Sequence, residues 1–195
     1  GWHVQLGSLK AEPDAKAGDV LILGKPLGVG ILSAALKKNL LDDAGYRAMV
    51  DATTKLNRPG MELSKLAGVH ALTDVTGFGL LGHGLELARG AGLTARIDSA
   101  RLPVLPGVQT LAEQGIFTGA SGRNWASYGA HIELGATVGD AQKALLTDPQ
   151  TSGGLLVSCA PDAVAQVLKV FADAGFAEAA IVGQMESGEA KVVVD

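Results

Sequence analysis

Apolar and polar positions along the chain alternate in a way that predicts strands separated by helices. Short apolar runs predict strands at residues 20–24, 69–73, 93–98, 155–159, 179–182 and 190–194. Apolar residues at helical spacing predict helices at residues 31–41, from Asp42–Asp43 to about residue 58, and at 61–66, 78–89, 108–114, 140–146 and 163–174. The stretch 116–137 is rich in glycine and weakly periodic, which predicts mostly loop.

The order of these elements indicates a mixed α/β protein. Strands and helices alternate through most of the chain, but the last two strands follow each other with only a turn at Glu186–Gly188 between them. Two strands joined by a short turn pair antiparallel, so the sheet is expected to be mixed and not purely parallel. We find no internal repeat.

Composition describes a folded protein and excludes several classes. The chain is 47% hydrophobic and only 18% charged, with 27 glycines in 195 residues. Its net charge is −4 and no basic run exceeds Lys37–Lys38, which argues against nucleic-acid binding. The sequence shows neither an apolar run long enough for a membrane span nor a signal peptide. The single cysteine, Cys159, is compatible with a reducing cytosol, and the start at Gly1–Trp2 suggests a piece of a longer chain.

The segment Thr73–Gly84 carries the clearest chemical signal. It follows a predicted strand and opens a predicted helix with a glycine-rich turn, an arrangement that leaves backbone N–H groups free to bind an anion. Asp74 stands at the mouth of this turn, which suggests a phosphate bridged by a metal ion. Asp74 could equally serve as a helix N-cap or form an Asx-turn.

The same segment also spells a dinucleotide fingerprint. Gly77–Gly82 matches G-x-G-x-x-G, and Asp98 follows 21 residues after Gly77, where a ribose-binding acid is expected. Asp74 counts against a pyrophosphate there, because the turn has no Lys or Arg to offset its charge. Regular βα repeats are also missing from the residues that follow.

Other polar residues have plainer interpretations. The turn Asp148–Gly154 is interpreted as a loop, and Lys25 as a solvated surface lysine, although Lys25 could meet a phosphate. Cys159 lies within an apolar run, which is typical of an inert buried thiol, and Ser152 lacks a nucleophile-elbow motif. The histidines show no metal-ligand spacing; they are His3, His70, His83 and His131.

Taken together, the motifs resemble the C-terminal half of the selenophosphate synthetase (selenide, water dikinase) family, which is similar to aminoimidazole ribonucleotide synthetase. They occur in family order and span the chain from about Lys16. The matching segments are Ala17–Leu23 with Lys25–Gly28, Leu72–His83, Arg123–Gly129 and Leu146–Leu156.

The resemblance implies a fold and a set of partners. It implies that residues 17–195 form a three-layer α/β/α domain with a mixed sheet, and that residues 1–16 are an extension or linker. It also implies a missing N-terminal domain, through which the protein forms a homodimer and builds its ATP site. The family reaction takes place in the cytoplasm and converts selenide, ATP and water to selenophosphate, AMP and phosphate.

The resemblance also assigns site residues. Asp74 matches the metal ligand that this half contributes to Mg²⁺, and Thr73, Thr76 and Gly77 are expected to shape the same loop. The family's catalytic Cys or selenocysteine and its catalytic Lys belong to the missing half, so no catalytic residue is expected in this chain. Neither Cys159 nor Lys25 matches them.

Some matching motifs have no role implied by the resemblance, namely the Asp148–Gly154 turn and Arg123–Asn124. Two alternatives to the selenium enzyme remain. One is a related ATP-dependent enzyme half, of the hydrogenase-maturation or thiamine-phosphate kinase type. The other is a non-enzymatic nucleotide-binding module.

Overall fold

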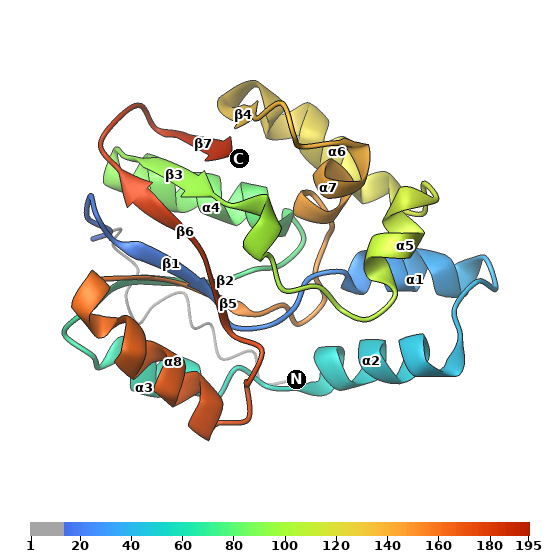
Figure 1. Cartoon of the computed structure of the whole chain (residues 1–195), viewed down its shortest axis with the longest axis horizontal. Helices are drawn as coiled ribbons and strands as arrows, with labels where there is room; N and C mark the ends of the chain where they lie inside the picture. Colours follow the sequence, from blue (N-terminus) through green and yellow to red (C-terminus); the bar gives the residue numbers. More distant parts are fainter. Residues whose placement is uncertain (1–13) are drawn as a thin grey trace.

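The fold is built on one mixed sheet. The computed structural model describes residues 14–195, so His3 and most of the predicted 1–16 extension lie outside the described residues. Seven strands are ordered β2-β5-β1-β6-β3-β7-β4 (Figure 1). They are β1 (Val20–Leu23), β2 (Val69–Asp74), β3 (Thr94–Ile97), β4 (Ile132–Leu134), β5 (Leu155–Cys159), β6 (Ala180–Glu186) and β7 (Lys191–Val194). Neighbours from β2 to β3 pair antiparallel, whereas β3–β7 and β7–β4 pair parallel, which confirms the predicted mixed sheet. The expected pairing of the last two strands is wrong, because β3 lies between β6 and β7.

Helices connect the strands, and their ends follow local capping rules. The α-helices are α1 (Val29–Lys37), α2 (Asp43–Thr54), α3 (Pro59–Ser64), α4 (Gly79–Ala91), α5 (Val108–Glu113), α6 (Gly119–Tyr128), α7 (Asp140–Leu146) and α8 (Val164–Asp173). Short 3₁₀ helices are η2 (Ser99–Arg101), η3 (Gly129–His131) and η4 (Pro161–Ala163). Asp42 caps α2 by accepting the Gly45 N–H at 2.7 Å, and Gly92 ends α4 in the left-handed conformation at φ 67°.

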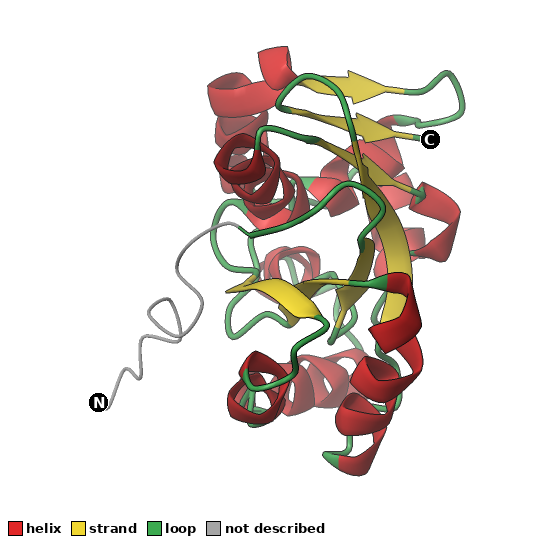
Figure 2. Ribbon diagram, turned by 90° about the vertical axis from the view of Figure 1, so that its left-hand side faces the viewer, coloured by secondary structure: helices red, strands yellow, loops and turns green. Residues whose placement is uncertain are grey.

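Alternating residues of the interior strand β1 face two separate apolar clusters. Leu21 and Leu23 pack with α1, α4, α5 and α7, whereas Ile22 packs with α3 and α8 around the fully buried Phe171. Side chains of a strand point alternately to opposite faces, so these helix groups cover opposite faces of the sheet. Figure 2 shows helices on both sides of the strands. The predicted three-layer α/β/α arrangement is therefore confirmed.

The prediction that residues 116–137 are mostly loop is wrong. This stretch contains α6, η3 and the edge strand β4. Thr118 begins α6 by accepting the Ser121 N–H at 3.2 Å. The buried side chains of α6 are Ser121, Asn124 and Tyr128, which share one face at helical spacing. That face carries polar atoms, so a search for hydrophobic periodicity does not find it.

Strand β6 is longer than predicted because Gly183 continues the strand. A β-carbon on Gly183 would lie 2.0 Å from the carbonyl oxygen of Arg96 on the neighbouring β3. The glycine therefore permits close backbone contact between two strands. Within the described part of the chain, no helix is long and apolar enough to cross a membrane.

The packing of Gly24 against Phe171 gives a stability test. A β-carbon on Gly24 would lie 2.6 Å from the Phe171 ring, so Gly24→Ala should lower the free energy of unfolding by about 1–3 kcal/mol. Gly122 on α6 has open space around its missing β-carbon, so Gly122→Ala should raise that free energy by roughly 0.5–1 kcal/mol. Urea unfolding of both variants measures the two effects. Equal shifts for both variants would contradict the packing described here.

Candidate functional site

Asp74 is the last residue of β2, and its side chain is exposed. Among the described residues, its carboxylate has no hydrogen-bond or ion-pair partner. The N-cap of α4 is Phe78, without a side-chain cap, and no Asx-turn bond forms. The capping interpretation of Asp74 is therefore wrong, and both carboxylate oxygens are available to a ligand.

The loop after Asp74 is held from within by His83. The Nε2 atom of this buried histidine lies 3.1 Å from both the backbone N and the Oγ1 of Thr76. Because the backbone N–H can only donate, Nε2 is the acceptor, and the ring proton is on Nδ1, which lies 3.3 Å from Glu86. His83 is thus a structural residue.

Helix α6 holds the same loop from outside. The amide of Asn124 donates to the carbonyl of Gly77 at 2.8 Å and to the carbonyl of Thr147 at 3.0 Å. The Tyr128 hydroxyl donates to the carbonyl of Phe78 at 2.6 Å. Two successive loop carbonyls are therefore fixed by buried side chains, which restricts the backbone next to Asp74. This gives Asn124 a role that the sequence left open, whereas its neighbour Arg123 is exposed.

The Asp148–Gly154 turn is a buried junction, so its interpretation as an ordinary loop is incomplete. Asp148 is fully buried, and its Oδ2 accepts the backbone N–H groups of Gly30 at 3.0 Å and Ile31 at 3.3 Å. The side-chain oxygen of Gln150 accepts the N–H groups of Gly28 and Val29, both at 3.3 Å. The two side chains together satisfy the free N–H groups at the start of α1.

Burial controls the ionisation of Asp148. Removal from water raises the pKa of its carboxyl to about 7, while the N–H donors from Ile31 and Gly30 and the Gln150 amide act in the opposite direction. Within residues 14–195, its second oxygen, Oδ1, has no hydrogen-bond partner. The positive end of the α1 dipole lies at this carboxyl and favours the charged form.

The turn lies directly against the segment that carries Asp74. The N–H of Val75 donates to the carbonyl of Gly154 at 2.9 Å, and the N–H of Gln150 donates to the carbonyl of Thr76 at 3.0 Å. A β-carbon on Gly153 would lie 1.9 Å from the carbonyl oxygen of Val75. Only glycine allows this approach, so the two segments form one rigid unit.

Lys25 is buried, so its interpretation as a solvated surface lysine is wrong. Its side chain is 4% exposed. The ammonium donates to the carbonyls of Ala52 at 3.0 Å, Lys55 at 2.5 Å and Ser152 at 2.6 Å. Burial, and secondarily the positive charge of Lys55, lowers the pKa of Lys25 to about 8. An ammonium has three N–H bonds, so none is left for a phosphate.

The dinucleotide interpretation is also wrong. A Rossmann site needs neighbouring parallel strands, but β2 pairs antiparallel with β5, and β3 lies on the far side of β6. The expected ribose ligand, Asp98, instead accepts the N–H of Ala100 at 3.0 Å and contacts Arg101. Gly82 is packed against the β-carbon of Phe78, which explains the glycine without a cofactor.

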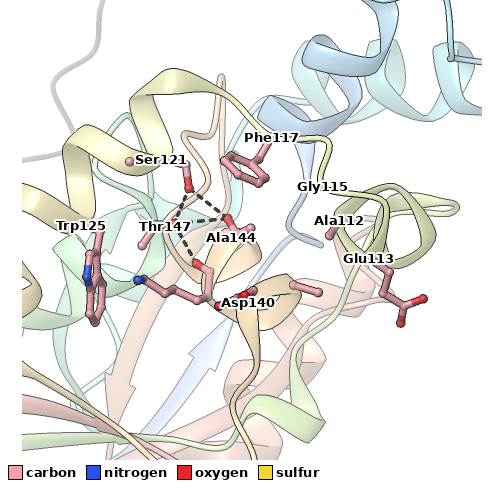
Figure 3. A pocket seen from close by; sticks show the side chains of 12 residues that line it. Ala112, Glu113, Gly115, Phe117, Ser121, Trp125, Asp140, Ala144 and Thr147 are labelled. Atoms are coloured by element: carbon pink, nitrogen blue, oxygen red, sulfur yellow. Dashed lines mark hydrogen bonds between the residues drawn. The ribbon is translucent and has the colours of Figure 1, made fainter.

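A cavity of about 420 Å³ lies between α5, α6 and α7 (Figure 3). The hydroxyls of Ser121 and Thr147 hydrogen-bond to each other in its wall, and the Trp125 ring lies 4.2 Å from the Lys143 ammonium. None of the predicted site residues lines this cavity. The predicted site is therefore the end of β2, with Thr73 and Asp74, and the loop after it, with Thr76 and Gly77; the buried Val75 separates the two pairs.

Cysteine chemistry and a complete metal centre both lack support within the described residues. Cys159 is fully buried in β5, and burial, with the nearby Asp19 and Asp162 carboxylates, raises the pKa of its thiol to about 11. No group of three or more His, Cys, Asp or Glu side chains in residues 14–195 could hold a metal ion. A metal ion bound by Asp74 would therefore need further ligands from outside these residues.

The buried carboxyl of Asp148 gives a pH-dependent stability test. With its pKa raised to about 7, the folded chain binds more protons at Asp148 than the unfolded chain does between about pH 4 and that value. This contribution to stability is therefore lost as the pH rises through the window. Asp148→Asn keeps an acceptor oxygen without the charge. The difference in free energy of unfolding, variant minus wild type, should therefore increase between pH 5 and pH 8, by roughly 3 kcal/mol at most.

Urea unfolding at the two pH values measures this gain. Asp148→Ala is the matched control, because it removes the acceptor as well as the charge. Its free energy of unfolding should lie about 2–4 kcal/mol below that of Asp148→Asn at both pH values, since the α1 N–H groups lose their partner and neither variant titrates at this position. A difference between Asp148→Asn and wild type that stays constant with pH would contradict the assignment.

Comparison with solved structures finds proteins with the same fold. The chain superposes on E. coli HypE, a hydrogenase maturation protein, with a TM-score of 0.67 at 22% identity, over 93% of this chain and 48% of that protein. A thiamine-monophosphate kinase from Stenotrophomonas maltophilia gives a TM-score of 0.63 at 21% identity, over 94% and 52%. A HypE structure in complex with ATP gives 0.62 at 17% identity, over 93% and 48%. At these identities the likeness shows the fold alone.

Comparison with curated proteins gives much closer relatives. The chain is 82% identical over 186 residues to the selenide, water dikinase of Pseudomonas straminea, and 68% identical to that of Paraburkholderia xenovorans. Each match covers 95% of this chain but 52% of the relative, so the chain spans about half the length of the curated relatives it matches. The family model "AIR synthase related protein, C-terminal domain" matches residues 16–195. The chain therefore belongs to the AIR synthase related proteins, as their C-terminal domain.

Proposed function

We propose that this chain is the C-terminal domain of a selenide, water dikinase and contributes Asp74 as a ligand of Mg²⁺ bound to ATP phosphates. The observation that carries the proposal is the free, exposed Asp74 carboxylate on a rigidly held loop, in a chain 82% identical to such an enzyme. The other polar groups of the loop described above are engaged within the fold. Asp74 is the group that has been left available.

The donor set of the loop fits magnesium as a partial site. Mg²⁺ prefers oxygen ligands and usually takes one or two carboxylates together with phosphate oxygens and water. Asp74 supplies a carboxylate, and the hydroxyls of Thr73 and Thr76 and the backbone of Gly77 border it. The remaining ligands are expected from ATP and from the other half of the protein. When bound, the metal would neutralise charge on the phosphates.

The reaction itself requires the whole protein. Selenide, ATP and water would yield selenophosphate, AMP and phosphate, with the nucleophilic Cys or selenocysteine and the catalytic Lys in the N-terminal half. Cys159 is buried, and the three N–H bonds of the Lys25 ammonium are all donated within the domain. Neither residue can therefore replace the nucleophile or the catalytic lysine. We further propose that the N-terminal half forms the homodimer and that the enzyme works in the cytoplasm.

Removing the metal ligand should abolish turnover without unfolding the protein. In the full-length parent, Asp74→Asn should lower selenide-dependent AMP formation by about two orders of magnitude or more, because phosphate charge is no longer neutralised at this ligand. Asp162→Asn is the matched control, since it removes an exposed carboxylate on η4. Thermal unfolding of both variants should stay close to wild type. Full activity in a folded Asp74→Asn protein would remove Asp74 from the site.

The isolated domain should have no activity of its own. Residues 1–195 incubated with selenide, ATP and Mg²⁺ should form no AMP above background, because the nucleophile, the lysine and most ATP contacts lie elsewhere. The full-length parent, assayed in parallel by nucleotide chromatography, provides the positive control. Selenide-dependent AMP from the isolated domain would overturn the division of labour proposed here.

A further inference from the structure

Ser152 has an unusual backbone conformation beside the Asp74 loop. Its φ is +51°, in the left-handed region. The other non-glycine residue with positive φ in residues 14–195 is Asn39, of a type that tolerates this region. Serine is strained there, and strained residues persist only where surrounding structure holds them. Gly153 and Gly154 follow immediately, so the chain uses glycine at the adjacent positions but serine at this one.

No contact of the Ser152 side chain within the fold explains why a serine occupies this position. Ser152 is exposed, and its hydroxyl makes no hydrogen bond to any residue in the described range. The turn runs against the segment after Asp74, where the Val75 N–H meets the carbonyl of Gly154. The exposed Ser152 therefore lies on the turn that pairs with the segment following the proposed metal ligand.

The backbone of the turn is anchored at three successive carbonyls. The ammonium of Lys25 donates to the carbonyl of Ser152 at 2.6 Å, the amide of Asn57 donates to that of Gly153 at 2.8 Å, and Val75 binds that of Gly154. The contact from Lys25 falls on the strained residue itself. The other two N–H bonds of this ammonium are donated to the carbonyls of Ala52 and Lys55, at the end of α2.

Burial of Lys25 makes this anchor a rigid one. A buried ammonium is tolerated only when its donors are satisfied, so displacing Ser152 would leave a charged N–H without an acceptor. The partners on the α2 side cannot follow the turn, because Ala52 and Lys55 belong to a different element. Lys25 therefore fixes the position of Ser152 relative to α2.

We propose that Ser152 binds a phosphate oxygen of the ligand held at Asp74, and that Lys25 is the positioning residue that keeps Ser152 in place. This inference rests on the proposed function for the identity of the ligand, a nucleotide phosphate. The part concerning Lys25 concerns the chain alone and can be tested without any ligand.

The first experiment tests the positioning by NMR on residues 1–195. Lys25→Met removes the ammonium at similar length, and should shift the Ser152 Cα and Cβ resonances away from left-handed values. It should also increase amide exchange of Val75 by at least about tenfold, since its acceptor belongs to the turn. Lys55→Met is the matched control, because the Lys55 ammonium contacts Gly175 and the Phe176 ring and does not touch the turn. Unchanged Ser152 resonances in Lys25→Met would overturn the positioning role.

Should Lys25→Met fail to fold, Lys25→Arg serves as the second variant. The wider guanidinium keeps the charge but cannot reproduce the three compact contacts of the ammonium. The same displacement of the Ser152 resonances is expected, and its absence would again overturn the role.

The second experiment tests the ligand contact in the full-length parent. Ser152→Ala should raise the KM for ATP about tenfold with little change in kcat, because a contact made equally in ground and transition states affects binding alone. Lys25→Met should raise the same KM, and the double variant should be no worse than the more affected single variant, because both act through one contact. An unchanged KM in Ser152→Ala, or additive effects in the double variant, would overturn the proposal.

The outcomes separate this inference from the proposed function. A wild-type parent that forms no AMP from selenide and ATP would overturn the proposed function, and the phosphate contact with it. An active wild type with an unaltered Ser152→Ala variant would overturn the inference and leave the proposed function standing.

Discussion

The side-chain oxygens of Asp148 and Gln150 accept four backbone N–H groups at the start of α1, between Gly28 and Ile31. A helix cannot satisfy these donors itself, and here they are buried away from water. If the turn shifted, four donors would lose their acceptors together, at roughly 1–3 kcal/mol each. The turn is thereby locked to α1, and through its contact with Val75 it locks the segment that carries Asp74.

Charge and helix polarity reinforce this arrangement. Asp148 lies at the N-terminal, positive end of α1, whereas Lys25 binds the carbonyls at the C-terminal, negative end of α2. These two buried groups do not pair with each other. Asp148 belongs to the turn and binds the start of α1, whereas Lys25 binds both the turn and the end of α2. Asp148 thus ties one end of the turn to α1, and Lys25 ties Ser152 in the same turn to α2, while Asn124 on α6 holds the neighbouring Gly77.

Sequence patterns predicted the elements whose buried faces are apolar. Strands β1 and β5 and helix α8 follow such patterns, whereas α6 was missed because it buries Ser121 and Asn124. Asp74 could be singled out from the sequence because its motif is contiguous, and its role as a metal ligand stays a prediction. Lys25 and Asp148 were misjudged because their partners are backbone groups 127 and 118 residues away, and a backbone group leaves no mark in the sequence.

Most polar groups described around the Asp74 loop form hydrogen bonds within the fold, whereas one does not. This contrast is what we expect of one half of a binding site. Around the loop, the carbonyls of Gly77 and Phe78 and the ring of His83 are engaged within the fold. The Asp74 carboxylate is not, and one carboxylate alone binds Mg²⁺ weakly, because the ion prefers near-octahedral oxygen coordination. Under the function proposed above, this rigid surface with a single ligand would bind the metal well only together with phosphates and a second set of protein ligands. Relatives about twice as long have room for that second set.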